Sequence, residues 1–255
     1  MAPKVTEVFF SPGGSGERIS GLFCGFAGWE GAEKLDLLRL RDFKGAAFQP
    51  GEVAVVTAPV FFGRIPEIVA RKLRDVKGDG TPAIAMVVYG NRYYEDALIE
   101  LADLLTANGF VLYGAGAFVA RHSIYPTIAK ERPDEEDEKI LRAFAQQCAE
   151  KIKTGSPLEA SIKGNRLYRS HGRIPFAPKG NSKCTACGAC VETCPVRAIP
   201  KDAPRRTDRE LCINCTACIR VCPEGARSYG GLLYHLGGMK IKKACSGHRT
   251  PEFFV

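Results

Sequence analysis

Eight of the eleven cysteines in this chain lie within 39 consecutive positions, and their spacing constrains the fold more than any other feature. The pattern Cys-x-x-Cys-x-x-Cys-x-x-x-Cys-Pro occurs twice, at Cys184, Cys187, Cys190 and Cys194 and again at Cys212, Cys215, Cys218 and Cys222. Cysteines crowded in this way indicate metal binding, whereas those of a disulfide-rich secreted protein are spread along a short chain.

The spacing predicts two [4Fe-4S] clusters. Three cysteines separated by two residues each can hold three corners of one cube, while the fourth, turned by a proline, ligates the other cube. We therefore expect one cluster on Cys184, Cys187, Cys190 and Cys222, and the other on Cys212, Cys215, Cys218 and Cys194. This block resembles the bacterial two-cluster ferredoxins, except that Thr216 stands where the first copy has Gly188.

Zinc is the alternative, because Cys-x-x-Cys pairs also build zinc sites. Two Cys-Pro endings and the lack of interspersed histidine disfavour it. Cys24, Cys148 and Cys245 lie outside the pattern, and we expect them to be packed or surface thiols.

Charge divides the chain into two unlike parts. Residues 155–255 contain 17 Lys and Arg against seven Asp and Glu, a net charge of +10, whereas residues 1–154 carry −2. With 255 residues and 45% hydrophobic content, the chain can fill two modest cores. We expect a first domain at 1–154, a linker at 155–182, a cysteine domain at 183–230 and a C-terminal extension at 231–255 whose role the sequence does not indicate.

Strand-like and helix-like segments alternate in residues 1–154, which is typical of an α/β protein with a parallel sheet. We expect five strands, at residues 5–10, 35–40, 53–58, 83–89 and 110–118. Helices are predicted after the loop at 11–16, after Pro66, over 94–108 and over 134–153. This order favours a doubly wound sheet.

The first strand leads through a glycine-rich loop, residues 11–16, into a helix, and this arrangement suits a phosphate. No lysine follows as in a P-loop, and the loop lacks the GxGxxG pattern, so ATP and NAD are disfavoured. Two aromatic loops, 59–66 and 89–96, follow the third and fourth strands. Ligands of open α/β sheets bind at these strand ends, so a flat ring could lie between the loops. The alternative for each loop is ordinary turning and packing.

Residues 1–154 look like a flavodoxin, and the whole chain resembles the flavodoxin–ferredoxin fusion proteins of anaerobes. The resemblance implies a flavodoxin-like five-stranded sheet followed by a small α+β ferredoxin-like domain. It also implies FMN, with its phosphate on the first loop and its ring beside Phe62-Gly63 and Tyr94. The implied FMN-binding residues are Ser11, Pro12, Gly13, Gly14, Ser15, Gly16, Pro59, Val60, Phe61, Phe62, Gly63, Tyr89, Gly90, Asn91, Arg92, Tyr94 and Asp96.

Two departures from flavodoxins concern single residues. The phosphate loop has only Ser11 and Ser15 as hydroxyl donors where flavodoxins often carry threonines, so backbone amides must hold more of the phosphate. Arg64 stands where some flavodoxins have an acidic residue; it either faces the flavin or points into solvent.

These features favour an electron-transfer protein that relays electrons between FMN and two clusters and on to a redox partner. The alternative is an FMN-dependent reductase of a quinone or other small acceptor, fed through the clusters. A radical-SAM enzyme is disfavoured because its CxxxCxxC pattern is missing. The basic half predicts partners with acidic docking surfaces, and nucleic acid is the rival interpretation of that charge. Without an apolar span or a secretory signal, we expect no membrane insertion and a cytoplasmic protein.

Overall fold

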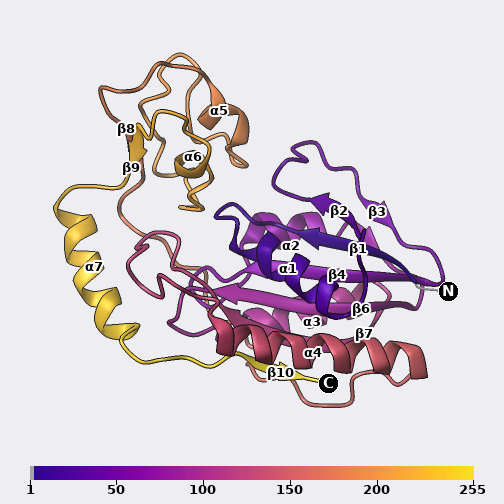
Figure 1. Ribbon diagram of the computed structural model, residues 1–255. Helices are drawn as coiled ribbons and strands as arrows, with labels where there is room; N and C mark the ends of the chain where they lie inside the picture. The colour runs from indigo at the N-terminus through magenta and orange to yellow at the C-terminus, as the bar shows by residue number, and fades with distance from the viewer. Residues whose placement is uncertain (1–2) are drawn as a thin grey trace.

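The computed structural model describes residues 3–255 (Figure 1). Its core is a sheet of five parallel strands: β1 (Lys4–Phe9), β2 (Glu33–Asp36), β4 (Glu52–Pro59), β6 (Thr81–Tyr89) and β7 (Phe110–Val119). They lie in the order β2-β1-β4-β6-β7. This is the doubly wound order 2-1-3-4-5 of flavodoxin-like folds, so the predicted fold class is confirmed.

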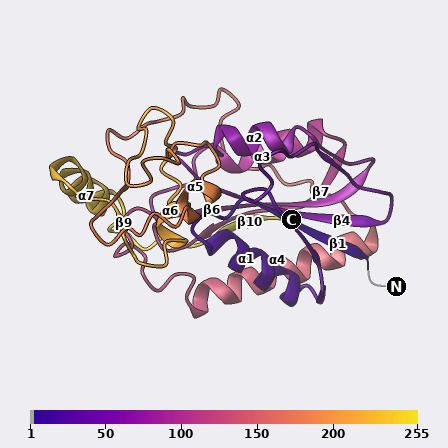
Figure 2. The same ribbon diagram turned by 90° about the horizontal axis from the view of Figure 1, so that it is seen from above.

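Helices cover both faces of the sheet (Figure 2). One face packs against α1 (Ser15–Phe26) and α4 (Glu135–Thr154), and the other against α2 (Glu67–Leu73) and α3 (Ala97–Ala107). Because both faces are covered, the central strands are apolar throughout, and β6 is buried from Ala83 to Tyr89. The longest helix, α4, begins in a capping box formed by Asp134 and Asp137 and ends at Gly155, whose φ is 69°.

Two predicted elements start or stop elsewhere. The second strand ends at Asp36, because the Asp36 carboxylate accepts a hydrogen bond from the Leu38 amide (2.9 Å) and turns the chain. The helix predicted from residue 94 begins at Ala97, because Glu95 has a φ of 47°, which no α-helix accommodates.

The expectation of five strands was incomplete. A sixth, β10 (Glu252–Phe254), pairs antiparallel with the outer edge of β7. Its Phe253 ring lies 5.2 Å from that of Phe144 on α4. A three-residue strand carries too short a pattern to be recognised, and its partner lies in a distant part of the chain.

The cysteine-rich part has little regular structure. It contains the helices α5 (Ala189–Thr193) and α6 (Ala217–Arg220) and the antiparallel pair β8 (Lys179–Gly180) and β9 (Arg227–Ser228). A second small pair, β3 (Ala46–Ala47) and β5 (Val76–Lys77), lies in the first part of the chain. Helix α7 (Leu232–Ala244) then leads back to the sheet, where β10 ends the chain (Figure 1).

Residues 155–182 are mostly irregular, and residues 165–169 lie against α3. The backbone amides of Asn165 and Arg169 donate to the carboxylate of Asp96 (3.0 and 2.9 Å), and the Tyr168 hydroxyl donates to Asp103 (2.6 Å). Among residues 3–255, no helix is long and apolar enough to cross a bilayer.

Candidate cofactor sites

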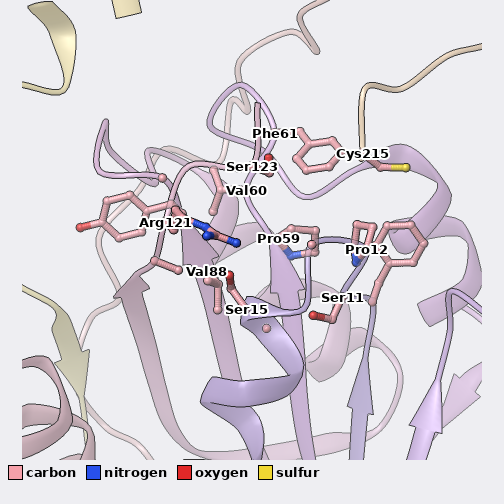
Figure 3. Close-up of a pocket in the computed structure, with 16 residues that line it drawn as sticks. Ser11, Pro12, Ser15, Pro59, Val60, Phe61, Val88, Arg121, Ser123 and Cys215 are labelled. Carbon is pink, nitrogen blue, oxygen red and sulfur yellow. The ribbon is translucent and has the colours of Figure 1, made fainter. Parts of the chain in front are cut away.

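A small cavity lies at the carboxyl ends of the central strands (Figure 3). Its volume is about 70 Å³, and it is bounded by the glycine-rich loop after β1 and by the loops after β4, β6 and β7. Ser11 and Ser15 line one side of it, and Arg121 and Ser123 line another. This is the edge at which open α/β sheets bind ligands.

The glycine-rich loop leaves backbone donors free. Gly14 has a φ of 88° and caps α1, while the Glu17 amide donates to the Ser11 hydroxyl oxygen (2.9 Å), which leaves the Ser11 hydroxyl hydrogen available. A Cβ at Gly16 would lie 3.3 Å from that oxygen, so the tight loop favours glycine there. In the described chain the amides of Gly13, Ser15 and Gly16 have no protein acceptor. Such amides at a helix N-terminus bind anions.

A larger cavity of about 580 Å³ adjoins the first and shares five lining residues with it, Val60, Phe61, Tyr89, Gly90 and Ser123. Its remaining lining is mainly apolar and aromatic and comes from the loops after β4, β6 and β7, from residues 174–176, from Asn214 and from α7. The two cavities form one cleft, with a polar end at the glycine-rich loop and an apolar end at α7. This shape fits FMN, which combines a phosphate with a flat aromatic ring.

Most of the residues predicted to bind FMN border this cleft. They are Ser11, Pro12, Gly13, Ser15, Gly16, Pro59, Val60, Phe61, Phe62, Gly63, Tyr89, Gly90 and Arg92. Four others, Gly14, Asn91, Tyr94 and Asp96, do not line it.

The side chains of Asn91, Tyr94 and Asp96 form hydrogen bonds outside the cleft. The structure does not place Tyr94 at the cleft: Tyr94 is fully buried, and its hydroxyl donates to Glu252 (3.0 Å), whereas its neighbour Tyr93 lines the cleft. Asp96 accepts the two amides of the linker. Asn91 donates to the carbonyls of Cys245 and Gly247 (2.8 and 2.9 Å), so it holds the C-terminal segment.

Sequence reasoning missed the loop after β7. Arg121, His122, Ser123 and Tyr125 all border the cleft. Their position directly after a central strand could have indicated them. The His122 Nδ1 accepts the amides of Ile124 and Tyr125 (both 3.2 Å), and burial lowers the pKa of His122 to about 4, so the imidazole is neutral. No pattern could have placed the residues of α7 or of the 174–176 segment there.

The structure brings the eight patterned cysteines together as two sets around two cavities of about 20 Å³ each. Cys184, Cys187, Cys190 and Cys222 line one, and Cys194, Cys212, Cys215 and Cys218 line the other. The two loops repeat an unusual backbone: Ala186 and Asn214 both have a φ of 57°, and Gly188 and Thr216 have φ values of 83° and 69°. This grouping is the crossed arrangement expected from the spacing.

The donors around these cavities suit a cluster. Amides point at the thiols in matching places, from Ala198 to Cys194 Sγ (3.3 Å) and from Ala226 to Cys222 Sγ (3.2 Å). Burial raises the pKa of Cys212 to about 11, so its thiolate would need a positive charge beside it, which a bound cluster would supply.

The cysteine-rich part touches the cleft. Cys215 lines the small cavity and Asn214 the large one. The Arg220 guanidinium donates to the Ser11 carbonyl (3.3 Å), and the Arg41 guanidinium donates to the carbonyls of Val191 and Glu192 at the end of α5. One cysteine set is thus next to the cleft.

Comparison with known proteins supports the iron–sulfur assignment of the cysteine-rich part. Residues 183–226 match the family described as 4Fe-4S dicluster domain. The chain therefore joins a flavodoxin-like doubly wound sheet to an iron–sulfur domain. This combination is consistent with the flavodoxin–ferredoxin fusion proteins that the sequence resembles.

Solved flavodoxin structures are similar to the first part of the chain. A flavodoxin from the domain Archaea has 15% sequence identity and a TM-score of 0.38, with 59% of this chain and 99% of that one covered. The flavodoxin of Streptococcus pneumoniae TIGR4 has 17% identity and a TM-score of 0.40, covering 58% and 98%. A short-chain flavodoxin associated with a non-canonical PDU bacterial microcompartment has 17% identity and a TM-score of 0.42, covering 61% and 100%. No curated protein matches the chain significantly.

Proposed function

We propose that this protein is an electron carrier in which FMN exchanges electrons with two [4Fe-4S] clusters. The observation that carries the proposal is the position of Cys215, which belongs to one cysteine set and also lines the small cavity beside the glycine-rich loop. A cluster held by Cys194, Cys212, Cys215 and Cys218 would be the neighbour of the flavin. FMN, when bound, supplies chemistry in which two electrons can be taken up together and given out singly.

The surface around the other cysteine set is where a redox partner would dock. The other cysteine set, Cys184, Cys187, Cys190 and Cys222, does not line the cleft, and its Cys187 is exposed. Lys183 and Arg205 are exposed nearby, and the Arg205 guanidinium donates to the Cys184 carbonyl (3.2 Å). A redox partner with an acidic docking surface would be steered to this end of the molecule.

Anaerobic purification with analysis of iron, sulfide and flavin tests the proposal. We expect about eight irons and one FMN per chain after reconstitution. Stoichiometric zinc instead of iron would contradict the cluster assignment. Full iron content without FMN binding would contradict the flavin assignment and leave a ferredoxin-like protein.

A second candidate function is reduction of a quinone or another small acceptor. The observation that favours it is the large cavity, which continues past the flavin loops to the apolar side of α7. Steady turnover of such an acceptor with no partner protein would support an enzyme, and its absence alongside rapid reduction of a partner would support the carrier.

A further inference from the structure

Arg121 is an exposed cation at the polar end of the cleft. It lies two residues after the end of β7 and lines the small cavity together with Ser11 and Ser15. Figure 3 shows its guanidinium pointing inward from the rim of this cavity. In the part of the chain that the structure describes, no acceptor or carboxylate contacts the Arg121 side chain.

Arg92, the other arginine that lines the cleft, forms two hydrogen bonds with Glu95 (2.9 and 2.8 Å). Arg121 differs, because within residues 3–255 no carboxylate pairs with its side chain. It is exposed to solvent at the rim of the cavity, so its charge is free to pair with an anion from outside the chain.

The opposite wall of the cavity favours the same anion. The free amides of Gly13, Ser15 and Gly16 and the N-terminus of α1 attract negative charge. Hydroxyl donors are few, since only Ser11 and Ser15 supply them from the glycine-rich loop. A guanidinium can supply the donors that the loop lacks, because its planar N–H groups match phosphate oxygens.

We propose that Arg121 binds the phosphate of FMN and makes the cleft selective for FMN over riboflavin. The proposal rests on the FMN site put forward above. It assigns the phosphate to a charged side chain from the loop after β7 as well as to the glycine-rich loop.

The test compares the affinities of FMN and riboflavin for the full cluster-containing chain after flavin removal, measured anaerobically by quenching of flavin fluorescence. The variants are Arg121→Gln and Arg121→Lys. The control is Arg74→Gln, which removes an equal charge from the exposed C-terminal end of α2. Circular dichroism and the cluster absorption of each variant report whether it folds.

We expect Arg121→Gln to weaken FMN binding by roughly ten- to a hundredfold, as for loss of a hydrogen bond to a charged group. Riboflavin affinity should stay the same, Arg121→Lys should recover part of the loss, and Arg74→Gln should change neither. Added salt should weaken FMN binding by the wild-type chain more than by Arg121→Gln.

Three outcomes would overturn the inference. If the wild-type chain binds FMN and Arg121→Gln has the same ratio of FMN to riboflavin affinity, Arg121 does not bind the phosphate. If Arg121→Gln weakens both flavins equally, the residue supports the fold of the cleft. If the wild-type chain binds neither flavin, the proposed flavin site fails and this inference falls with it.

Discussion

Arg64 illustrates how a single side chain can be predicted in the wrong surroundings. The sequence offered two positions for it, facing the flavin or pointing into solvent, and the structure shows neither. Its guanidinium forms two hydrogen bonds with Glu100 of α3 (2.6 and 2.7 Å) and lies 4.8 Å from the centre of the Tyr168 ring. Glu100 also accepts the Ile65 amide (3.1 Å). Arg64 therefore joins the loop after β4 to α3 and the linker.

Arg64→Met should lower the free energy of unfolding by about 3–5 kcal/mol, because it leaves the buried Glu100 carboxylate without its partner. The double variant Arg64→Met, Glu100→Met should lose much less, since it removes both charges. Anaerobic denaturant unfolding followed by circular dichroism measures both values. Equal losses in the single and double variants would show that the ion pair does not explain the effect.

Glu7 is a buried carboxylate on β1, only 3% exposed, and within residues 3–255 its Oε2 atom has no hydrogen-bond partner. Burial raises the pKa of Glu7, because the charged form loses its hydration. The charged form therefore destabilises the folded state at neutral pH, and the folded state takes up a proton more readily than the unfolded chain as the pH falls.

Glu7→Gln should stabilise the protein at pH 8 by about 1–2 kcal/mol, because the uncharged amide costs less to bury. The advantage over the wild type should shrink as the pH falls towards the pKa of Glu7, since the wild-type carboxyl then becomes neutral. Unfolding midpoints at pH 8 and pH 6 measure the difference. If the stability advantage of Glu7→Gln over the wild type grew as the pH fell, the raised pKa of Glu7 would be contradicted.

At the scale of elements, the two cysteine loops are nearly identical in backbone, yet a glycine at one conformationally demanding position of the first loop is a threonine in the second. Gly188 precedes α5, and Thr216 precedes α6, both with positive φ. A β-branched residue rarely adopts this conformation. The Thr216 hydroxyl donates to the Cys215 carbonyl (2.6 Å) and lies close to Gly13 of the glycine-rich loop. Thr216, the residue that departs from the repeat, is therefore also a residue that contacts the glycine-rich loop.

The crossed cysteine sets predict how pairs of substitutions combine. Cys194→Ala should damage the same cluster as Cys215→Ala, so the double variant should lose no more iron than either single variant, about four atoms per chain. Cys194→Ala with Cys187→Ala should lose both clusters. Iron analysis and electron paramagnetic resonance of the reduced protein measure the losses. Additive losses for Cys194 and Cys215 would mean that the two cysteines serve different clusters.

At the scale of the whole molecule, the C-terminal segment connects the cysteine-rich part to the outer edge of the sheet. Helix α7 forms one wall of the large cavity, and its Tyr234 hydroxyl donates to the Ile124 carbonyl (3.2 Å). Beyond α7, Asn91 binds two carbonyls of the chain, and β10 pairs with β7. The position of α7 thus depends on contacts made at both of its ends.

Removing residues 248–255 should loosen α7 without disturbing the clusters. We expect hydrogen exchange in α7 to quicken by roughly tenfold or more, which corresponds to about 1.4 kcal/mol of local stability. Exchange in α5 and α6 should stay unchanged, and the cluster absorption serves as the control. Unchanged exchange in α7 would show that β10 does not hold the helix in place.

The sequence by itself determined the two most local features of this protein. The cysteine spacing is short-range, because each loop must present its thiols within a few residues, and the structure gathers the same eight side chains into the expected sets. The alternation of strands and helices also depends on local pattern, and it predicted the doubly wound sheet. The loops after β1, β4 and β6 followed from that order, because the carboxyl ends of parallel strands meet at one edge.

Only the tertiary structure decided which side chains at that edge face the cleft. Tyr93 and Tyr94 are adjacent and chemically alike, yet Tyr94 is packed into the core, where Glu252 from the far end of the chain accepts its hydroxyl. The sixth strand, the wall formed by α7 and the contact of Cys215 with the flavin cleft likewise depend on segments far apart in sequence. Such pairings are set by burial and hydrogen bonding in the folded chain, which leave no periodic or spacing pattern in the residues themselves.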